Sequence, residues 1–305
     1  MKIVLDLTKL LEEGKITKEE YDKFSGLAKK ETVGILPNIL VGFGTILIFC
    51  GIASFAKSIE FIFALSVIFI GVGFFIREKL FKDWGILSSI FIILGTISAS
   101  GAYFELFDFY SDGSELNYKI AIGSIALFIA AMSYFARSAL LAGFSALTIG
   151  ALLGVGTSYY SATYYFFVEQ PSLTIAVYGA LSILTYSLSN IFSSQIERLL
   201  LAFSRVSFFL VNMAFWIGSF WGDKEYFISN NLFSIGWLAF LIIMIIFGVV
   251  KNKRFTINMS VTFLSIHFYT QFFERFGVDP ISFIIAGFFA LIIAIALWKY
   301  NKKLN

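Results

Sequence analysis

The chain has 305 residues, of which 58% are hydrophobic, 19% aromatic and only 14% charged, and its formal net charge is +3. Soluble domains carry about 25% charged residues, so a soluble fold would expose too much apolar surface and the bilayer is the natural solvent. Spanning segments in lipid must be helices or a closed barrel, and apolar runs of about twenty residues indicate helices. The sequence therefore predicts an all-α, polytopic membrane helix bundle.

The first 32 residues are polar and charged, which predicts a small water-soluble helical hairpin in place of a cleavable signal peptide. Thr17-Lys18-Glu19-Glu20 is a capping box, in which Thr17 accepts from the amide of Glu20 and Glu20 reaches back to the amide of Thr17. Gly14 suits the left-handed end of a preceding helix over about 5–13, and the second helix extends to about residue 30.

The apolar residues of this hairpin form one seam, flanked at the cap by a hydrophobic staple. A hairpin this small buries too little apolar surface to be secure alone. We expect it to dock on a second copy, on cytoplasmic loops or on a partner protein; the alternative is a simple folded leader. The docking residues are Leu10, Leu11, Ile16, Thr17, Glu20, Tyr21 and Phe24.

After this hairpin, a transmembrane domain over 33–305 is expected. Ten spans are predicted at about 35–56, 59–76, 84–104, 119–136, 138–158, 172–192, 199–221, 231–250, 255–273 and 281–298. An even number of spans puts both termini on one side. That side holds 19 of the 23 Lys and Arg residues, while the 20 Asp and Glu residues divide equally. By the positive-inside rule both termini are cytoplasmic. The net charge is thus a topology signal, and nucleic-acid binding is not expected.

An outer loop after the third span joins carboxylates to aromatic side chains. Such a rim draws a cation or a cationic lipid headgroup, although aromatic belts are ordinary at membrane interfaces. The candidate rim residues are Glu105, Asp108, Asp112 and Glu115.

Two polar features lie in later spans. Arg205 stands about a turn inside the seventh span, where it either snorkels to the cytoplasmic interface beside Glu197 as an anchor or contacts a substrate anion. His267, Gln271 and Glu274 share one face of the ninth span, either as a polar cavity or proton relay or as hydrogen-bonding contacts between helices. Other candidate residues of such a cavity are Asn212 and Tyr103.

The leader "LTKLLEEGKITKEEYDKFSGLAKK" resembles the short helical-hairpin motif of the SHOCT type, which is associated with oligomerisation. Together with "NILVGFGTILIFCGIASFA" and "ISASGAYFELFDFYSDGSELNYKIAIGSIAL", the chain is similar to a family of predicted membrane proteins, domain of unknown function 2157. It departs from that family in having "KSIEF" where Asn-Trp is expected after the first span. The resemblance implies a location in the inner membrane of a bacterium. The family has no established activity, so the resemblance implies no catalytic residues.

Motifs for chemistry are sparse. The lone Cys50 excludes an intrachain disulfide, and the sequence carries no Cys/His metal cluster, phosphate-binding glycine loop or protease motif. We therefore expect no enzyme, cofactor or metal. Two functions remain open: a scaffold or subunit of a membrane complex that docks through the hairpin, or a transporter of a small molecule, an ion or a lipid. Membrane lipids are partners in either case.

Overall fold

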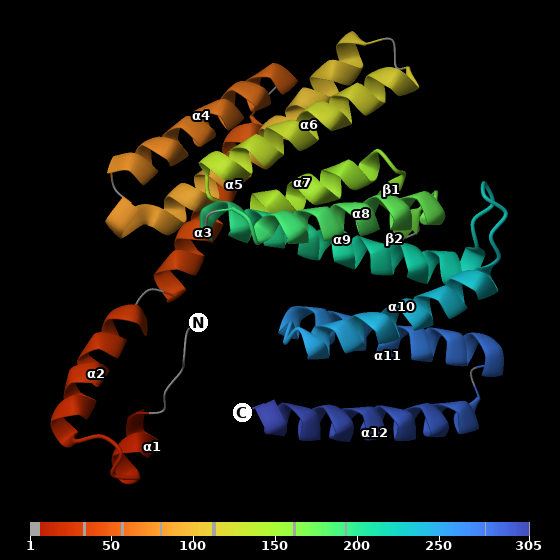
Figure 1. The fold of residues 1–305 in the computed structure, drawn as a ribbon. Helices are drawn as coiled ribbons and strands as arrows, with labels where there is room; N and C mark the ends of the chain where they lie inside the picture. The colour runs from red at the N-terminus through yellow and green to blue at the C-terminus, as the bar shows by residue number, and fades with distance from the viewer. Residues whose placement is uncertain are drawn as a thin grey trace. The chain divides into compact units, whose positions relative to one another are not determined.

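The computed structural model describes residues 7–32, 35–55, 58–79, 81–111, 114–160, 163–192, 194–277 and 279–304. It is helical apart from one short two-stranded ribbon (Figure 1). The chain folds as two compact units, Met1–Ala121 and Ile122–Asn305. Helix α6 (Glu115–Phe135) contains the boundary between them.

The predicted hairpin consists of α1 (Leu7–Glu12) and α2 (Lys18–Thr32). The capping box is confirmed: the Thr17 amide donates to Glu20 Oε2 at 2.9 Å, and the Glu20 amide donates to Thr17 Oγ1 at 3.2 Å. Gly14 takes the left-handed conformation with φ of 65°, as the turn requires. The hairpin thus has satisfied backbone groups at the start of α2 without help from the rest of the chain.

The first unit continues with α3 (Ile35–Ser54), α4 (Ile59–Lys79) and α5 (Phe81–Tyr110), the last kinked at Trp84. Helices α4 and α5 pack closely because glycines face the partner helix at Gly73 and Gly95. The Ser88 hydroxyl donates to the Gly73 carbonyl oxygen at 2.8 Å across this contact. Three aromatic rings join α3 to this pair, with centroids 4.9 and 4.7 Å apart along the series Phe49, Phe69 and Phe91.

The second unit holds the remaining elements. Helices α8 and α9 lie side by side, α10 packs on both α9 and α11, and α12 follows beside α11 (Figure 1). The elements are α7 (Ala139–Ala151), β1 (Val155–Tyr160), β2 (Thr163–Val168), α8 (Pro171–Ser189), α9 (Ser194–Trp221), α10 (Asn230–Val250), α11 (Arg254–Phe276) and α12 (Pro280–Leu304).

A tight turn separates α6 from α7. In the sequence, only Arg137 marks the boundary between the predicted spans 119–136 and 138–158. Arg137 has a left-handed backbone with φ of 49°, which is uncommon for a residue with a side chain. Its carbonyl oxygen accepts from Arg198 Nη2 at 2.7 Å, and Ser138 caps α7 by accepting from the Leu141 amide. The start of α9 therefore stabilises the turn between the fourth and fifth predicted spans.

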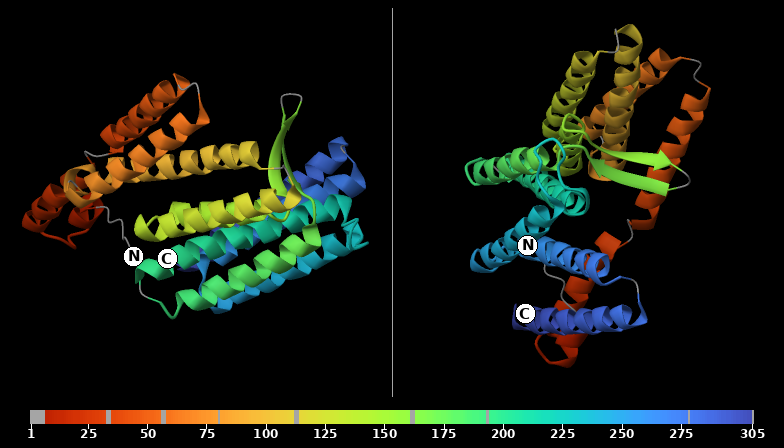
Figure 2. Two further views of the ribbon diagram at one scale, coloured as in Figure 1. Left: turned by 90° about the horizontal axis from the view of Figure 1, so that it is seen from above. Right: turned by 90° about the vertical axis from the view of Figure 1, so that its right-hand side faces the viewer.

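The helix predicted over 138–158 ends earlier, at Ala151. Gly154 is left-handed with φ of 66°, and the chain after it pairs as the antiparallel ribbon β1–β2, from Val155 opposite Val168 to Tyr160 opposite Thr163. Aromatic and β-branched residues favour this extended pairing over helix. The base of the ribbon packs on Ala214 of α9, and the ribbon stands out from the helices of its unit (Figure 2).

Six helices are long and apolar enough to cross a membrane: Ile59–Lys79, Trp84–Tyr110, Glu115–Phe135, Pro171–Ser189, Ser194–Trp221 and Asn230–Val250. Each corresponds to one predicted span. Three further apolar helices are shorter over the residues searched, namely Leu40–Ser54, Ala139–Ala151 and Pro280–Ile292. The structure therefore supports a helical membrane protein with six candidate spans.

Substituting Gly95 with alanine tests the close packing of α4 on α5. A Cβ at Gly95 would lie 2.7 Å from the Ser66 carbonyl oxygen and 3.0 Å from the Ile70 amide nitrogen. We expect Gly95→Ala to destabilise the protein by about 1–3 kcal/mol through overpacking, seen as a lower Tm in detergent. The matched control is Gly101→Ala on the same helix, where a Cβ meets nothing within 4 Å. Equal Tm values for the two variants would contradict this packing.

Candidate functional site

A buried polar cluster joins α9, α10 and α11. Ser234 of α10 lies at its centre: its hydroxyl donates to Gln271 Oε1 at 2.9 Å. His267 Nε2 lies 3.2 Å from the Ser234 hydroxyl and 3.0 Å from the Ser234 carbonyl oxygen, so a proton on Nε2 is donated to this serine. Gln271 Nε2 donates in turn to Ser219 of α9 at 3.4 Å. Two of the residues predicted on the ninth span are thus tied to both neighbouring helices.

Asn212 extends the same cluster. Trp237 Nε1 donates to Asn212 Oδ1 at 3.1 Å, and Asn212 Nδ2 donates to the Phe208 carbonyl oxygen at 2.8 Å. Asn212 and Trp237 are both 0% exposed. The Trp237 ring meets the His267 ring edge-on, with centroids 5.0 Å apart. The Trp237 indole of α10 and the His267 imidazole of α11 therefore connect the Asn212 amide of α9 to the contacts around Ser234.

The geometry of this cluster is that of internal pairing. The His267, Gln271 and Asn212 side chains each bond to protein groups, and the His267 ring packs against the Trp237 ring. In a bilayer, such hydrogen bonds hold helices together because the alternative is an unpaired polar group in hydrocarbon. Of the other residues predicted for this cavity, Glu274 is exposed, and Tyr103 belongs to the first unit, where its ring packs 5.8 Å from that of Phe107.

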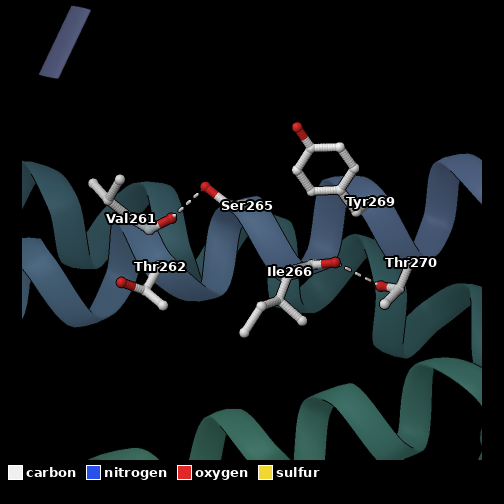
Figure 3. Close-up of a pocket in the computed structure, with 6 residues that line it drawn as sticks. All are labelled: Val261, Thr262, Ser265, Ile266, Tyr269 and Thr270. Carbon is white, nitrogen blue, oxygen red and sulfur yellow. Dashed lines mark hydrogen bonds between the residues drawn. The ribbon is translucent and has the colours of Figure 1, made fainter. Parts of the chain in front are cut away.

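A groove on another face of α11 is lined by Val261, Thr262, Ser265, Ile266, Tyr269 and Thr270 (Figure 3). Its serine and threonine hydroxyls donate to carbonyl oxygens of α11 itself, whereas the Tyr269 hydroxyl donates to the Ala286 carbonyl oxygen of α12 at 3.2 Å. Ser265 donates to the Val261 carbonyl oxygen at 3.1 Å and Thr270 to that of Ile266 at 2.8 Å (Figure 3). Serine and threonine that bond in this way present methyl or methylene surface to a neighbour. The groove therefore offers an apolar contact surface.

A larger cavity of about 690 Å³ lies between α8, α9 and α10 and reaches the turn before α11. Arg205 lines it, together with Lys253 and Arg254. His267 and Gln271 line neither this cavity nor the groove on α11.

Arg205, the predicted interfacial anchor, lies against the Phe255 ring and not beside Glu197. The guanidinium carbon lies 4.9 Å from the centroid of the Phe255 ring. Among the residues that the structure describes, no ion pair joins Arg205 to Glu197. The arginine is exposed and its charge is held over an aromatic face, a cation–π arrangement.

The predicted outer rim is described in part. Glu105 and Asp108 are exposed near the end of α5, and Glu115 starts α6, where it forms an ion pair of 2.6 Å with Lys119. Asp112 lies outside the described residues. Across the described part of the chain, no group of three or more His, Cys, Asp or Glu side chains could hold a metal ion.

Asp223, in the loop after α9, is a buried carboxylate that the sequence analysis did not single out. It accepts from the amide of Ser172 at 3.0 Å, and so caps α8, whose own N-cap residue Gln170 makes no side-chain cap bond. It also accepts from the amides of Glu225 and Tyr226 at 3.1 and 3.2 Å. Burial raises the pKa of Asp223, but these hydrogen bonds from Ser172, Tyr226 and Glu225 outweigh it and hold the pKa below its ordinary value.

The sequence alone did not identify Ser234 and Trp237 either, because both lie far along the chain from their partners. Ser234 lies 33 and 37 positions from His267 and Gln271, and Trp237 lies 25 from Asn212. A periodicity within one helix carries no signal for such pairs. A single observation pointed towards them: uncommon polar residues inside apolar spans require partners on other helices.

No family model, curated protein or solved structure matches the chain. Its function is therefore inferred from the residues and their geometry.

Replacing Asn212 with leucine tests whether the cluster stabilises the bundle. Asn212→Leu has a side-chain volume close to that of asparagine but leaves the Trp237 N–H buried and unpaired. This lowers the free energy of unfolding by about 1–3 kcal/mol. We expect a lower Tm in detergent than for the unmodified protein. Ser265→Ala is the control, since that hydroxyl bonds only within α11, and its Tm should barely change. A shift for Asn212→Leu no larger than the control would show that the cluster contributes nothing.

Proposed function

We propose that this chain is a multi-pass inner-membrane protein with ten spans and cytoplasmic termini that serves as a scaffold or subunit of a membrane complex. The observation that carries the proposal is the internal pairing of His267, Gln271 and Asn212. A proton or substrate relay requires polar groups that are open to a cavity, whereas these are committed to Ser234 and Trp237. Such a core suits a protein whose membrane domain holds a fixed shape.

Four helices beyond the six candidates complete the ten spans. Helix α11 has 23 residues and extends about 34 Å, enough to cross a hydrocarbon core of about 30 Å. Its polar side chains lower its hydropathy, and the cluster with α9 and α10 gives them partners. Helix α7 has 13 residues and spans only about 20 Å, so we place it as a short span with local bilayer thinning. Helices α3 and α12 have 20 and 25 residues.

Cysteine labelling tests the topology. In a Cys50→Ala background, a membrane-impermeant maleimide added to intact cells should label Lys224→Cys, in the loop after α9. It should label Lys251→Cys, after α10, and Lys15→Cys, in the hairpin, only once the membrane is permeabilised. All three positions are exposed, so accessibility depends on the side of the membrane. Labelling of Lys15→Cys in intact cells would refute cytoplasmic termini.

The hairpin α1–α2 is proposed as the docking element. It has its own cap, and Leu10, Leu11 and Tyr21 are half-buried, while Phe24 is 43% exposed. A hairpin this small cannot bury these apolar side chains by itself, so the proposal places them against another protein surface. The resemblance to the SHOCT type of hairpin supports the same interpretation, because that motif is associated with oligomerisation.

Native mass spectrometry of the protein from its own membrane tests the docking. Deleting residues 1–31 should lower the mass of the complex by a second copy or by a partner protein. Phe24→Ser should weaken the same association by removing apolar surface, whereas Lys23→Ser, a neighbouring exposed position, is the matched control. An unchanged oligomeric state and unchanged co-purifying proteins after the deletion would overturn the docking proposal.

Transport of a small molecule, an ion or a lipid is the second candidate. One observation favours it, namely the cavity between α8, α9 and α10, which is large enough for a ligand. Transport requires in addition that this cavity open alternately to the two sides of the membrane.

A further inference from the structure

The cavity between α8, α9 and α10 has an apolar body. Its volume of about 690 Å³ is within the range of about 300–1,000 Å³ that is usual for small-ligand sites. Side chains of two helices form most of its apolar wall: Leu201, Phe208 and Val211 of α9, and Phe240, Met244 and Phe247 of α10. Hydrocarbon is the chemistry that fits such a wall.

Two serine hydroxyls that line the cavity are occupied by each other's backbone. Ser182 of α8 donates to the Ser204 carbonyl oxygen at 3.1 Å, and Ser204 of α9 donates to the Ser182 carbonyl oxygen at 2.9 Å. This reciprocal pair holds α8 against α9 and uses both hydroxyl protons. The body of the cavity therefore has little left to offer a polar ligand group.

Three cationic side chains lie at one end, where the turn from α10 to α11 meets α9. They are Arg205, Lys253 and Arg254, and no Asp or Glu is among the residues that line the cavity. Arg205 is held over the Phe255 ring at 4.9 Å, and Lys253 Nζ lies 5.4 Å from the centroid of the Tyr186 ring. In the described part of the chain, no carboxylate forms an ion pair with any of the three. Aromatic faces thus position the charges without neutralising them.

Apolar walls with an uncompensated basic end match the two halves of an anionic amphiphile. A phosphate or carboxylate accepts charge-assisted hydrogen bonds from arginine and lysine, and an acyl chain fills the apolar part. Under the topology proposed above, the basic end lies at the cytoplasmic interface, where anionic lipid headgroups are found.

We propose that this cavity binds one anionic phospholipid, with an acyl chain between α8, α9 and α10 and the phosphate at Arg205, Lys253 and Arg254. The site is separate from the polar cluster on α11 and from the docking hairpin, and it does not depend on the scaffold function. The lipid is drawn from the surrounding bilayer; a soluble phosphate compound has the same headgroup chemistry and is distinguished by the experiment.

The test is native mass spectrometry of the full chain in neutral detergent, titrated with phosphatidylglycerol or with phosphatidylcholine. One phosphatidylglycerol should bind in a saturable way, at least about tenfold more tightly than phosphatidylcholine. The variant Arg205→Gln with Lys253→Gln should lose about tenfold in affinity for phosphatidylglycerol, since each cation near an anionic headgroup contributes appreciably. Lys251→Gln is the matched control: it removes a cation from the same turn that does not line the cavity, and affinity should be unchanged.

A second variant tests the apolar half without changing charge. Gly179 lines the cavity, and a Cβ there meets nothing within 4 Å, so Gly179→Leu adds a side chain to this space without a clash at Cβ. It should weaken phosphatidylglycerol binding without lowering the Tm in detergent, because leucine also favours the helix more than glycine does. The proposal would be overturned if phosphatidylcholine bound as tightly as phosphatidylglycerol. It would also be overturned if neither Gly179→Leu nor the double variant Arg205→Gln with Lys253→Gln weakened phosphatidylglycerol binding. Displacement of phosphatidylglycerol by millimolar inorganic phosphate would assign the site to a soluble phosphate compound and contradict the proposal that it binds a lipid.

Discussion

Hydrocarbon offers no hydrogen-bond partner, so a polar group among apolar helices is costly unless the chain itself pairs it. Most buried polar side chains of the described residues are paired; the exceptions are the side chains of Ser172, Thr174, Ser207, Trp216 and Ser260. Most hydroxyls meet this constraint locally: Thr45, Ser66 and Thr96 each donate to a carbonyl oxygen four residues earlier. Side chains that cannot be satisfied within one helix need a neighbour. His267, Gln271 and Asn212 are of this kind, and their pairing determines how α9, α10 and α11 meet.

Small residues complement this polar pairing. Where Gly73 and Gly95 face the partner helix, α4 and α5 approach closely enough for Ser88 to reach a backbone carbonyl oxygen across the contact. In the second unit, the buried Tyr178 of α8 donates to the Ala146 carbonyl oxygen at 2.6 Å and so joins α8 to α7. Close contacts of this type allow dispersion and hydrogen bonds to replace the hydrophobic effect, which contributes little between helices already in lipid.

The two proposals concern different parts of the second unit. The polar cluster around Ser234 holds helices together, and the cavity between α8, α9 and α10 binds a ligand. Around Ser234 the polar groups are mutually satisfied, and among the described residues no Lys or Arg side chain forms a hydrogen bond to that cluster. In the cavity between α8, α9 and α10 the Ser182 and Ser204 hydroxyls are paired as well. The charges of Arg205, Lys253 and Arg254 there are not matched by carboxylates among the described residues. Hydrogen-bonding capacity for a ligand is therefore concentrated at one basic end, beside walls that suit an acyl chain.

Local signals in the sequence determined the membrane class, the approximate position of most helices and the capped hairpin, because hydropathy and the Thr17–Glu20 box act within one or two turns of chain. Only the tertiary structure decided that α7 ends at Ala151 and yields to a ribbon packed on α9, and that Ser234 and Trp237 are the partners of the polar residues. It also decided that Lys253 and Arg254 join Arg205 at one cavity, about fifty positions away along the chain. These outcomes depend on which helix faces are adjacent in space, and residue spacing within a single helix contains no information about that.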